Sequence, residues 1–228
     1  MTGTEAYFYL VLPAFLFSLW ASFNVKSTFK KYSSVLAKRR ITSEQAVNAV
    51  LAYNNVYGVR TEYISGELTD HYDPKANTIR LSQSVSGFSS IAAIGVAAHE
   101  AGHAVQYGKS YSLIKLRSAI IPVCQIGSNA AMPLIIAGLF FSFEFLIQLG
   151  LIFFGTSVLF QLVTLPVEFD ASRRAVTALK AAGILDTEEL NGAKKVLTAA
   201  ALTYVAALAA ALANFIRLIA MFSRRNSR

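Results

Sequence analysis

The chain has 228 residues, of which 54% are hydrophobic and only 15% are charged. This composition excludes an ordinary soluble domain, in which about 25% of residues are charged, and it predicts a membrane protein. The net charge of +8 comes without a nucleic-acid recognition module, so we expect the basic residues to face anionic lipid and expect no nucleic-acid partner. The single cysteine, Cys124, excludes an intramolecular disulfide and a cysteine-type zinc site.

The first predicted element is an uncharged stretch from Phe8 to Asn24. The residues before it include Glu5 but no Lys or Arg, and no small-x-small site precedes a polar mature start. We therefore interpret the stretch as a retained membrane anchor and not as a cleaved signal. Six basic residues and no acidic ones follow it, at Lys26, Lys30, Lys31, Lys38, Arg39 and Arg40. By the positive-inside rule, this segment lies in the cytoplasm.

A small α+β portion is predicted after the basic segment. Thr42 and Gln45 have the spacing of a capping box, and apolar positions after them indicate a short helix. Three strand-like segments come next, and a turn-forming cluster at Asp73–Asn77 separates the last two. The segments are Thr61–Ile64, Leu68–Tyr72 and Thr78–Leu81.

The last of these strands is a candidate for substrate binding. A strand beside an active site can hold an extended peptide by strand addition, in which backbone hydrogen bonds give affinity. The residues considered for this role are Thr78, Ile79, Arg80 and Leu81. Structural packing of the hairpin explains the same residues equally well.

The most informative motif is His99-Glu100-Ala101-Gly102-His103, within a strongly helical stretch. Positions i and i+4 lie on one face of a helix, with Cβ atoms about 5–6 Å apart, so both imidazoles can bind one metal ion. This is the spacing of zinc hydrolases. Zinc lowers the pKa of a bound water toward about 7, and Glu100 is placed to take the proton of that water.

The alternative reading of the motif is a chance grouping of buried helix residues. It would leave two imidazoles and a carboxylate without partners in an apolar helix, which is costly. Two of the chain's three histidines also fall within the motif. Gly102 costs about 1 kcal/mol against alanine in a helix interior, which indicates that another segment packs closely there.

The next stretch, Ala119–Val167, carries one charge, Glu144, in 49 residues. A membrane crossing needs about 20 apolar residues, so we expect two crossings that turn near Glu144. Two crossings return Glu168 to the side of His99 and His103. A catalytic zinc usually has three protein ligands, and we expect Glu168 to be the third.

Other assignments for the third ligand stay open. Asp170 and His71 are the alternatives, and Asp170 is better placed to orient a ligand histidine. Asp170 and Arg174 also have the i, i+4 spacing of a solvated ion pair, and Glu168 fits an ordinary first-turn acid. His71, Tyr72 and Tyr107 are candidates for polarising a carbonyl, but polar packing is the simpler explanation, so no oxyanion residue is assigned.

The last apolar stretch, Val196–Ile216, is uncharged and rich in alanine, as in a fourth crossing or a helix packed on the bundle. Four crossings from an outside N-terminus would put Arg224, Arg225 and Arg228 outside, against the positive-inside preference. The predicted fold is a mainly α membrane protein with about four transmembrane helices and a small α+β zincin-like portion. The expected segments are an anchor at 1–25, a cytoplasmic α+β portion with the metal helix at 26–117, a transmembrane hairpin at 118–167, a cytoplasmic helix with the third ligand at 168–195, and a membrane or membrane-packed helix with a basic tail at 196–228.

Long strings along the chain resemble the YugP-type family of membrane-bound neutral zinc metallopeptidases. Besides the anchor, they are Leu68–Pro74, Asn77–Leu81, Ile91–Gln106 and Leu165–Arg174. The resemblance implies a gluzincin-type peptidase with one zinc ion per chain, with His99, His103 and Glu168 as ligands and Glu100 as catalytic base. The chain is more distantly similar to the integral-membrane prenyl-protein and heat-shock zinc proteases. Those carry Glu-Phe-x-Ala-Asp where this chain has Glu168-Phe-Asp-Ala-Ser172.

The expected function is that of a multi-pass endopeptidase of the cell membrane with its active site on the cytoplasmic side. It would hydrolyse membrane-associated or misfolded proteins through a zinc-activated water. The alternative is a non-catalytic, zinc-stabilised membrane adaptor or peptide-binding regulator. A transporter is less favoured, because no span carries paired intramembrane charges. The sequence identifies no partner subunit.

Overall fold

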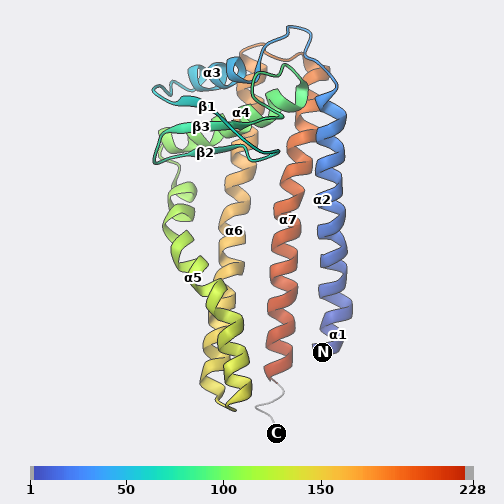
Figure 1. The fold of residues 1–228 in the computed structure, drawn as a ribbon, viewed down its shortest axis with the longest axis vertical. Coiled ribbons are helices and arrows are strands. Elements are labelled where there is room, and N and C mark those ends of the chain that lie inside the picture. Colours follow the sequence, from blue (N-terminus) through green and yellow to red (C-terminus); the bar gives the residue numbers. More distant parts are fainter. Residues whose placement is uncertain (1–2, 224–228) are drawn as a thin grey trace. The chain divides into compact units, whose positions relative to one another are not determined.

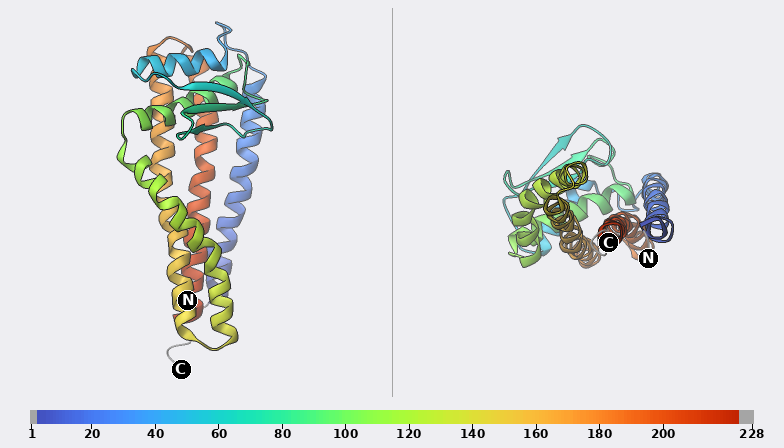
Figure 2. Two further views of the ribbon diagram at one scale, coloured as in Figure 1. Left: turned by 60° about the vertical axis from the view of Figure 1, so that its left-hand side comes forward. Right: turned by 90° about the horizontal axis from the view of Figure 1, so that it is seen from below.

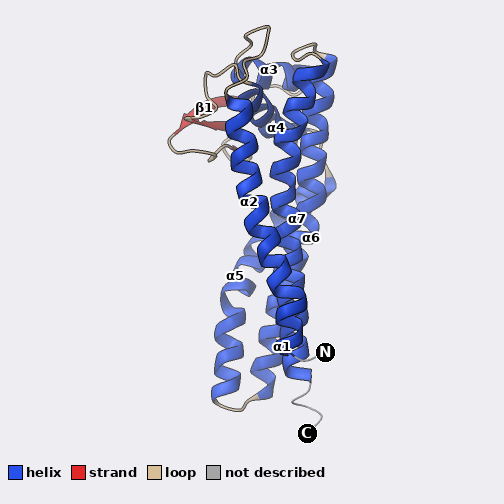
Figure 3. Cartoon of the chain, turned by 90° about the vertical axis from the view of Figure 1, so that its right-hand side faces the viewer, coloured by secondary structure: helices blue, strands red, loops and turns tan. Residues whose placement is uncertain are grey.

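The computed structural model describes residues 3–223 (Figure 1). Most of these residues are helical, and the strands are confined to one small sheet (Figure 3). In chain order the elements are α1 (Gly3–Ala6), the π-helix η1 (Tyr7–Val11), α2 (Leu12–Ser33), α3 (Ser43–Tyr53), β1 (Arg60–Ile64), β2 (His71–Asp73), β3 (Thr78–Ser82), α4 (Ile91–Gly108), α5 (Ser112–Phe140), α6 (Glu144–Ala181) and α7 (Thr187–Ser223). Arg224, Arg225 and Arg228, whose charges bear on the topology, lie outside the described residues.

Four helical stretches are long and apolar enough to cross a membrane. They are Thr4–Ser33, Ser112–Phe140, Glu144–Ala181 and Thr187–Phe222. The last contains the alanine-rich stretch at 196–216, and the second and third are the two arms of the expected hairpin. The prediction of a mainly α membrane protein with about four such helices and a small α+β part is confirmed.

The chain divides into two compact units. The helical unit comprises Met1–Ser22, Lys115–Pro166 and Leu202–Arg228, and the mixed unit comprises Phe23–Ile114 and Val167–Ala201. The mixed unit therefore contains the sheet, α3, α4 and the part of α6 that begins at Val167. In the helical unit, α5 and α6 run side by side before and after the connection at 141–143 (Figure 2).

Within the mixed unit, α3 begins where the sequence predicts. The Thr42 backbone N–H donates to Gln45 Oε1 at 2.9 Å, and the Gln45 backbone N–H donates to Thr42 Oγ1 at 3.3 Å. This reciprocal pair is the expected capping box. The helix then buries its apolar face against α4, in a core that also contains Ile79 and Leu81 of β3. This core fixes the helix that carries the histidine motif.

The sheet has the strand order β1-β3-β2, with β1 parallel and β2 antiparallel to β3. The predicted hairpin forms, and Asp73 closes its turn because Oδ1 accepts the backbone N–H groups of Lys75 and Ala76 at 2.9 and 3.2 Å. β2 lies between β1 and β3 in sequence, but in the sheet it pairs with the far side of β3. β3 is therefore the central strand, with β1 on one side and β2 on the other.

The central place of β3 corrects the expectation that Thr78, Ile79, Arg80 and Leu81 form a substrate-binding edge. β3 is hydrogen-bonded to a strand on each side, so it has no free edge for an added strand. Ile79 and Leu81 are buried in the core. Arg80 joins the strands, because its guanidinium lies 2.9 Å from Asp73 of β2 and 3.5 Å from Glu62 of β1. The edge strands are β1 and β2.

Glu44, in the first turn of α3, binds the loop before α4. Its Oε1 accepts the backbone N–H of Gly87 at 2.8 Å and the hydroxyl of Ser86 at 2.9 Å. Burial raises the pKa of Glu44, but the hydrogen bonds from the backbone, Ser86 and Ser43 outweigh it, so the pKa lies below its ordinary value. A lowered pKa in the folded state stabilises the protein above the unfolded pKa of 4.5, and this stabilisation is lost as the pH falls through the folded value.

Glu44→Gln is therefore expected to lower the free energy of unfolding by about 1 kcal/mol at neutral pH, because one carboxylate is lost from a partly exposed hydrogen-bond group. The difference from the parent should shrink as the pH falls below 4.5 and through the lowered folded-state pKa. Urea unfolding in detergent across this pH range measures it, with Glu67→Gln in an exposed loop as the control. A difference that does not change with pH would contradict the role given to the Glu44 charge.

Candidate metal centre

Helices α4 and α6 bring three potential metal-ligating side chains together in the mixed unit. One ligand atom each from His99, His103 and Glu168 lies within 4.8 Å of the others. Glu168 Oε2 is 3.2 Å from His99 Nε2 and 3.4 Å from His103 Nε2. The two imidazole rings, one helical turn apart, have centroids 4.7 Å apart. Both Nε2 atoms therefore converge on the same carboxylate oxygen, as the spacing on α4 predicts.

The two helices approach closely because α4 has a glycine at the crossing. A Cβ added at Gly102 would lie 2.4 Å from the carbonyl oxygen of Ala171 and 3.1 Å from its Cα. Both atoms belong to the backbone of α6, which cannot swing aside as a side chain can. The close packing expected at Gly102 is confirmed. Ala171 lies between Glu168 and Ser172 in sequence, so the same contact sets the distance between the histidines and the α6 residues that face them.

A neighbouring polar side chain contacts the Nδ1 atom of each histidine. His99 Nδ1 is 3.0 Å from Ser172 Oγ, and His103 Nδ1 is 3.0 Å from Gln106 Oε1. The Gln106 amide nitrogen donates to the Val167 carbonyl at 2.8 Å and to Asp170 Oδ2 at 3.0 Å. Because both amide hydrogens are used, Oε1 accepts and His103 Nδ1 must donate. A neutral His103 then presents the lone pair of Nε2 toward Glu168, as a metal ligand requires.

Asp170 holds a histidine less directly than the sequence suggests. Among the described residues it contacts neither histidine, and it reaches His103 only through Gln106. Its other partners are the guanidinium groups of Arg173 and Arg174. The expected ion pair with Arg174 is present, with Nε 2.5 Å from Oδ2. Asp170 therefore anchors the glutamine that holds the ring.

Sequence reasoning missed Gln106 and Ser172 as partners of the histidines. The signals were the helical spacings, because Gln106 is three residues after His103 and Ser172 is four residues after Glu168. Such spacings place side chains on one helix face. They do not show which residue faces the other helix.

Glu100 follows His99 on α4 and is buried, with 8% of its surface exposed. Within residues 3–223 its carboxylate takes part in no hydrogen bond and no ion pair. Its charge nevertheless acts on the neighbouring ring. Burial lowers the pKa of His103, but the hydrogen bond to Glu168 and the charges of Glu100 and Glu168 raise it more, so the pKa of the metal-free imidazole lies above its ordinary value.

His71 does not join the group. It lies on β2, where Nδ1 is 2.8 Å from the Thr69 carbonyl and Nε2 is 3.5 Å from the Arg80 guanidinium. Tyr72 and Tyr107 pack against each other with ring centroids 5.5 Å apart. Burial raises the pKa of Tyr72, which keeps its hydroxyl neutral. The Tyr72 hydroxyl donates to Asn77 Oδ1 at 2.7 Å, so it stabilises the turn of the hairpin.

The three side chains fit a zinc ion. Two imidazole nitrogens and one carboxylate oxygen are an established catalytic zinc set, with bonds of about 2.0–2.2 Å. Two ligand atoms of one tetrahedral ion then lie roughly 3.3–3.6 Å apart. The observed separations of 3.2 and 3.4 Å between Glu168 and the two histidines are close to this range. These two separations and the chemistry of the donors agree with a zinc site.

Gln106→Leu should weaken zinc binding by about 10–100-fold, because His103 loses the acceptor that fixes its tautomer and orientation. Competition with a chromophoric chelator measures the affinity. Gln83→Leu, which replaces an exposed glutamine, should leave it unchanged. A folded Gln106→Leu protein with the parent's zinc affinity would show that the hydrogen bond to His103 does not matter for binding.

Comparison with known proteins agrees with this centre. The family model described as "Putative neutral zinc metallopeptidase" matches residues 7–223. A Bacillus subtilis (strain 168) protein described as "Putative membrane protease YugP" is 44% identical over 216 residues, which cover 95% of this chain and 96% of the relative. No solved structure matches the chain. The chain has four helices that are long and apolar enough to cross a membrane, and it matches the membrane protease relative over nearly its whole length. It is therefore a multi-pass membrane protein. Because the family model covers the helices and the His-His-Glu group alike, the chain belongs to the neutral zinc metallopeptidase family that this model describes.

Proposed function

We propose that the protein is a membrane-embedded zinc endopeptidase that hydrolyses membrane-associated or misfolded proteins. The observation that carries the proposal is the convergence of His99, His103 and Glu168 on one point, next to the buried carboxylate of Glu100. Membership of a zinc metallopeptidase family supports the same reaction and implies a peptide or protein substrate.

His99, His103 and Glu168 would hold one zinc ion per chain. When bound, zinc polarises the scissile carbonyl as a Lewis acid and lowers the pKa of water toward about 7. Ser172 and Gln106 hold the imidazoles through Nδ1 so that both Nε2 atoms stay directed at the ion site. The low exposure of Glu168, at 2%, keeps the carboxylate ligand away from bulk water.

Glu100 is the general base in this proposal. It follows His99 directly on α4, and among the described residues its carboxylate has no partner that would compete for a proton. One of its oxygens takes a proton from the attacking water and passes it to the nitrogen of the departing amine. Proton transfer by a positioned carboxylate typically contributes about 10²–10⁴-fold to a rate.

An extended substrate would pair with an edge of the sheet. Since β3 is central, the candidate edges are those of β1 and β2. β2 packs against α4, the helix of the histidine motif, through Tyr72 and Tyr107. Strand addition would give affinity through backbone hydrogen bonds without demanding one sequence.

The orientation in the membrane is part of the proposal, as is the division into segments at 1–25, 26–117, 118–167, 168–195 and 196–228. Six basic residues in 26–40 favour a cytoplasmic location for the segment that leads to α4. The candidate span α5 and the apolar part of α6 before Glu168 separate α4 from Glu168 in sequence. An even number of crossings returns the chain to the same face, which agrees with the grouping of Glu168 with His99 and His103.

The test compares zinc-loaded and metal-stripped protein in detergent, with casein as an unstructured substrate. We expect His103→Ala to lose both zinc and casein cleavage, because one of three ligands is gone. His71→Ala, which removes the histidine outside the group, should keep both. Elemental analysis gives the zinc content, and released fluorescent fragments give the cleavage rate. Cleavage that survives complete removal of zinc would overturn the proposal.

A further inference from the structure

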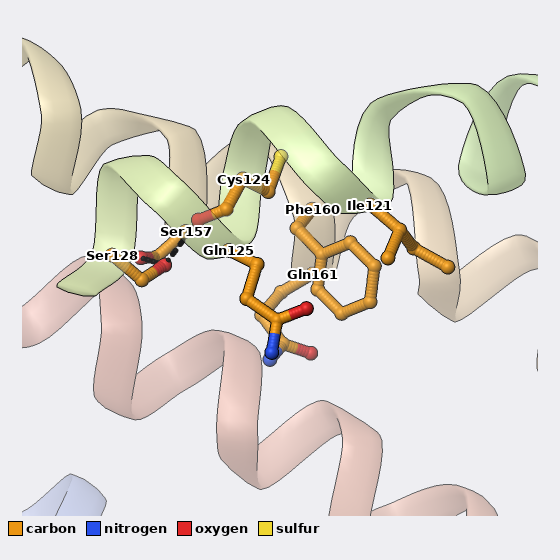
Figure 4. A pocket seen from close by; sticks show the side chains of 7 residues that line it. All are labelled: Ile121, Cys124, Gln125, Ser128, Ser157, Phe160 and Gln161. Carbon is orange, nitrogen blue, oxygen red and sulfur yellow. Dashed lines mark hydrogen bonds between the residues drawn. The ribbon is translucent and has the colours of Figure 1, made fainter.

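The helical unit contains a pocket of about 330 Å³ between α5 and α6 (Figure 4). Its walls are mainly apolar, but four polar side chains enter it. The lining residues are Ile121, Cys124, Gln125, Ser128, Ser157, Phe160 and Gln161. None of them belongs to the candidate metal centre.

The pocket lies next to a tight contact between the two helices. A Cβ added at Gly127 would be 2.4 Å from Thr156 Oγ1, and one added at Gly150 would be 2.8 Å from the Ala131 carbonyl. Ser128 Oγ is 2.6 Å from Ser157 Oγ at the same level. On the other side of Gln125, Pro122 removes a backbone hydrogen bond from α5. Figure 1 shows α5 diverging from α6 in this direction.

The two glutamines of the pocket have no partner for their carboxamides. Within residues 3–223, neither Gln125 nor Gln161 makes a hydrogen bond, although both side chains extend into the pocket (Figure 4). The two serines, in contrast, are bonded to each other, and the Ser128 hydroxyl is also within hydrogen-bond distance of the Cys124 carbonyl. The pocket therefore offers donors and acceptors that the chain itself leaves unused.

These carboxamides lie in the uncharged parts of both helices. Gln125 is eight residues after Arg117, about 12 Å along the helix. Gln161 is 17 residues after Glu144, about 25 Å along the helix. A hydrocarbon core about 30 Å thick covers such positions, and there no water is available to bond them. A polar group at that depth is costly unless something binds it.

The chemistry of the lining selects the class of ligand. A carboxamide both donates and accepts, so its complement is a group that does the same, such as a peptide bond. Lipid acyl chains have neither donor nor acceptor. A continuous transmembrane helix satisfies its own peptide groups, so only a segment with broken helical structure offers them within the bilayer. Ile121 and Phe160 provide apolar contact for the side chains beside such a break.

We infer that this pocket binds the unwound backbone of a membrane-embedded substrate segment, through the carboxamides of Gln125 and Gln161. The inference rests on the proposed peptidase function and narrows its substrate class to transmembrane segments that contain a helix break. A peptidase needs an extended substrate, and the pocket stabilises the first unpaired peptide groups of a segment that is leaving its helical form.

The test is photo-crosslinking, which needs no catalysis. The protein carries Glu100→Gln and a benzophenone amino acid at Ile121, in phosphatidylcholine–phosphatidylglycerol vesicles. The probes are two single-span peptides of equal composition, one with a central Gly-Pro break and one with these residues moved to its end. We expect strong crosslinking to the broken peptide. Combining Gln125→Leu with Gln161→Leu should reduce it about tenfold, as the loss of one to two hydrogen bonds implies.

Matched controls come from the same helix. Asn129→Leu also removes a carboxamide from α5 but lies outside the pocket, so crosslinking should persist. Moving the benzophenone to Ile126, which is exposed outside the pocket, should abolish the preference for the broken peptide. Zinc content and circular dichroism of every variant report whether the fold is retained.

Three outcomes would overturn the inference, namely equal crosslinking of both peptides, no effect of the double leucine variant, and crosslinks formed only to lipid or to a second copy of the chain. None of them bears on zinc-dependent cleavage of casein. Failure of the casein experiment with selective crosslinking would instead reject the peptidase and leave a membrane-segment receptor.

Discussion

Replacing Glu100 with glutamine is expected to lower peptide-bond hydrolysis by at least about 10²–10⁴-fold while the protein keeps its zinc. Glutamine has nearly the same shape as glutamate, but its amide cannot take a proton from water. Glu100 lies outside the group of His99, His103 and Glu168, so the change removes no ligand. With no hydrogen bond to Glu100 among the described residues, no structural partner is lost either.

Casein cleavage by the parent and the variant at equal zinc content measures this effect. Glu188→Gln, a change at the exposed start of α7, is the control and should cleave as fast as the parent. Substantial activity in the Glu100→Gln protein would reject the general-base role. Zinc binding without cleavage of casein by the parent would favour the adaptor function over the peptidase.

The second large effect is expected for Gly102→Ala. In a helix interior this change alone favours the helix by about 1 kcal/mol. Here the new Cβ would lie 2.4 Å from the Ala171 carbonyl oxygen, so α4 and α6 must move apart. Overpacking of this kind costs about 1–3 kcal/mol, and the net result is a less stable protein. Ala171 lies between Glu168 and Ser172 on α6, so the movement also pulls these two residues from the histidines. A metal site tolerates errors of only about 0.5 Å.

We expect Gly102→Ala to lower the unfolding temperature and to weaken zinc binding by at least about tenfold. Thermal unfolding in detergent and chelator competition give the two values. Gly95→Ala is the matched control on the same helix, because its Cβ would meet Ala193 at an ordinary 3.5 Å and should leave stability unchanged or raised. A Gly102→Ala protein that equals the parent in both measurements would show that the helices can separate without cost.

Much of the architecture could be predicted because its causes are local in sequence. The long uncharged runs set the four candidate spans through their length and composition alone. The Thr42–Gln45 capping box depends on residues three apart, and the pairing of His99 with His103 depends on one helical turn. Even the third member of the group, Glu168, followed from counting two crossings between α4 and the next acidic segment. These inferences need only the period of a helix and the thickness of a bilayer.

The tertiary structure decided the features that depend on which faces meet. Helical spacing left several residues of α4 and α6 equally able to hold the histidines, and only the crossing at Gly102 and Ala171 brings Ser172 to His99 and turns Asp170 to Gln106. The first and third strands were predicted to within one residue, but the middle strand begins at His71 and not at Leu68. Alternation of residues along one strand also does not reveal its neighbours. The parallel pairing of β1 with β3 therefore moved the expected substrate edge away from Thr78–Leu81. Short stretches of sequence determine which residues form each helix or strand and how they are spaced. The partner of each side chain depends on long-range packing, which no short stretch of sequence contains.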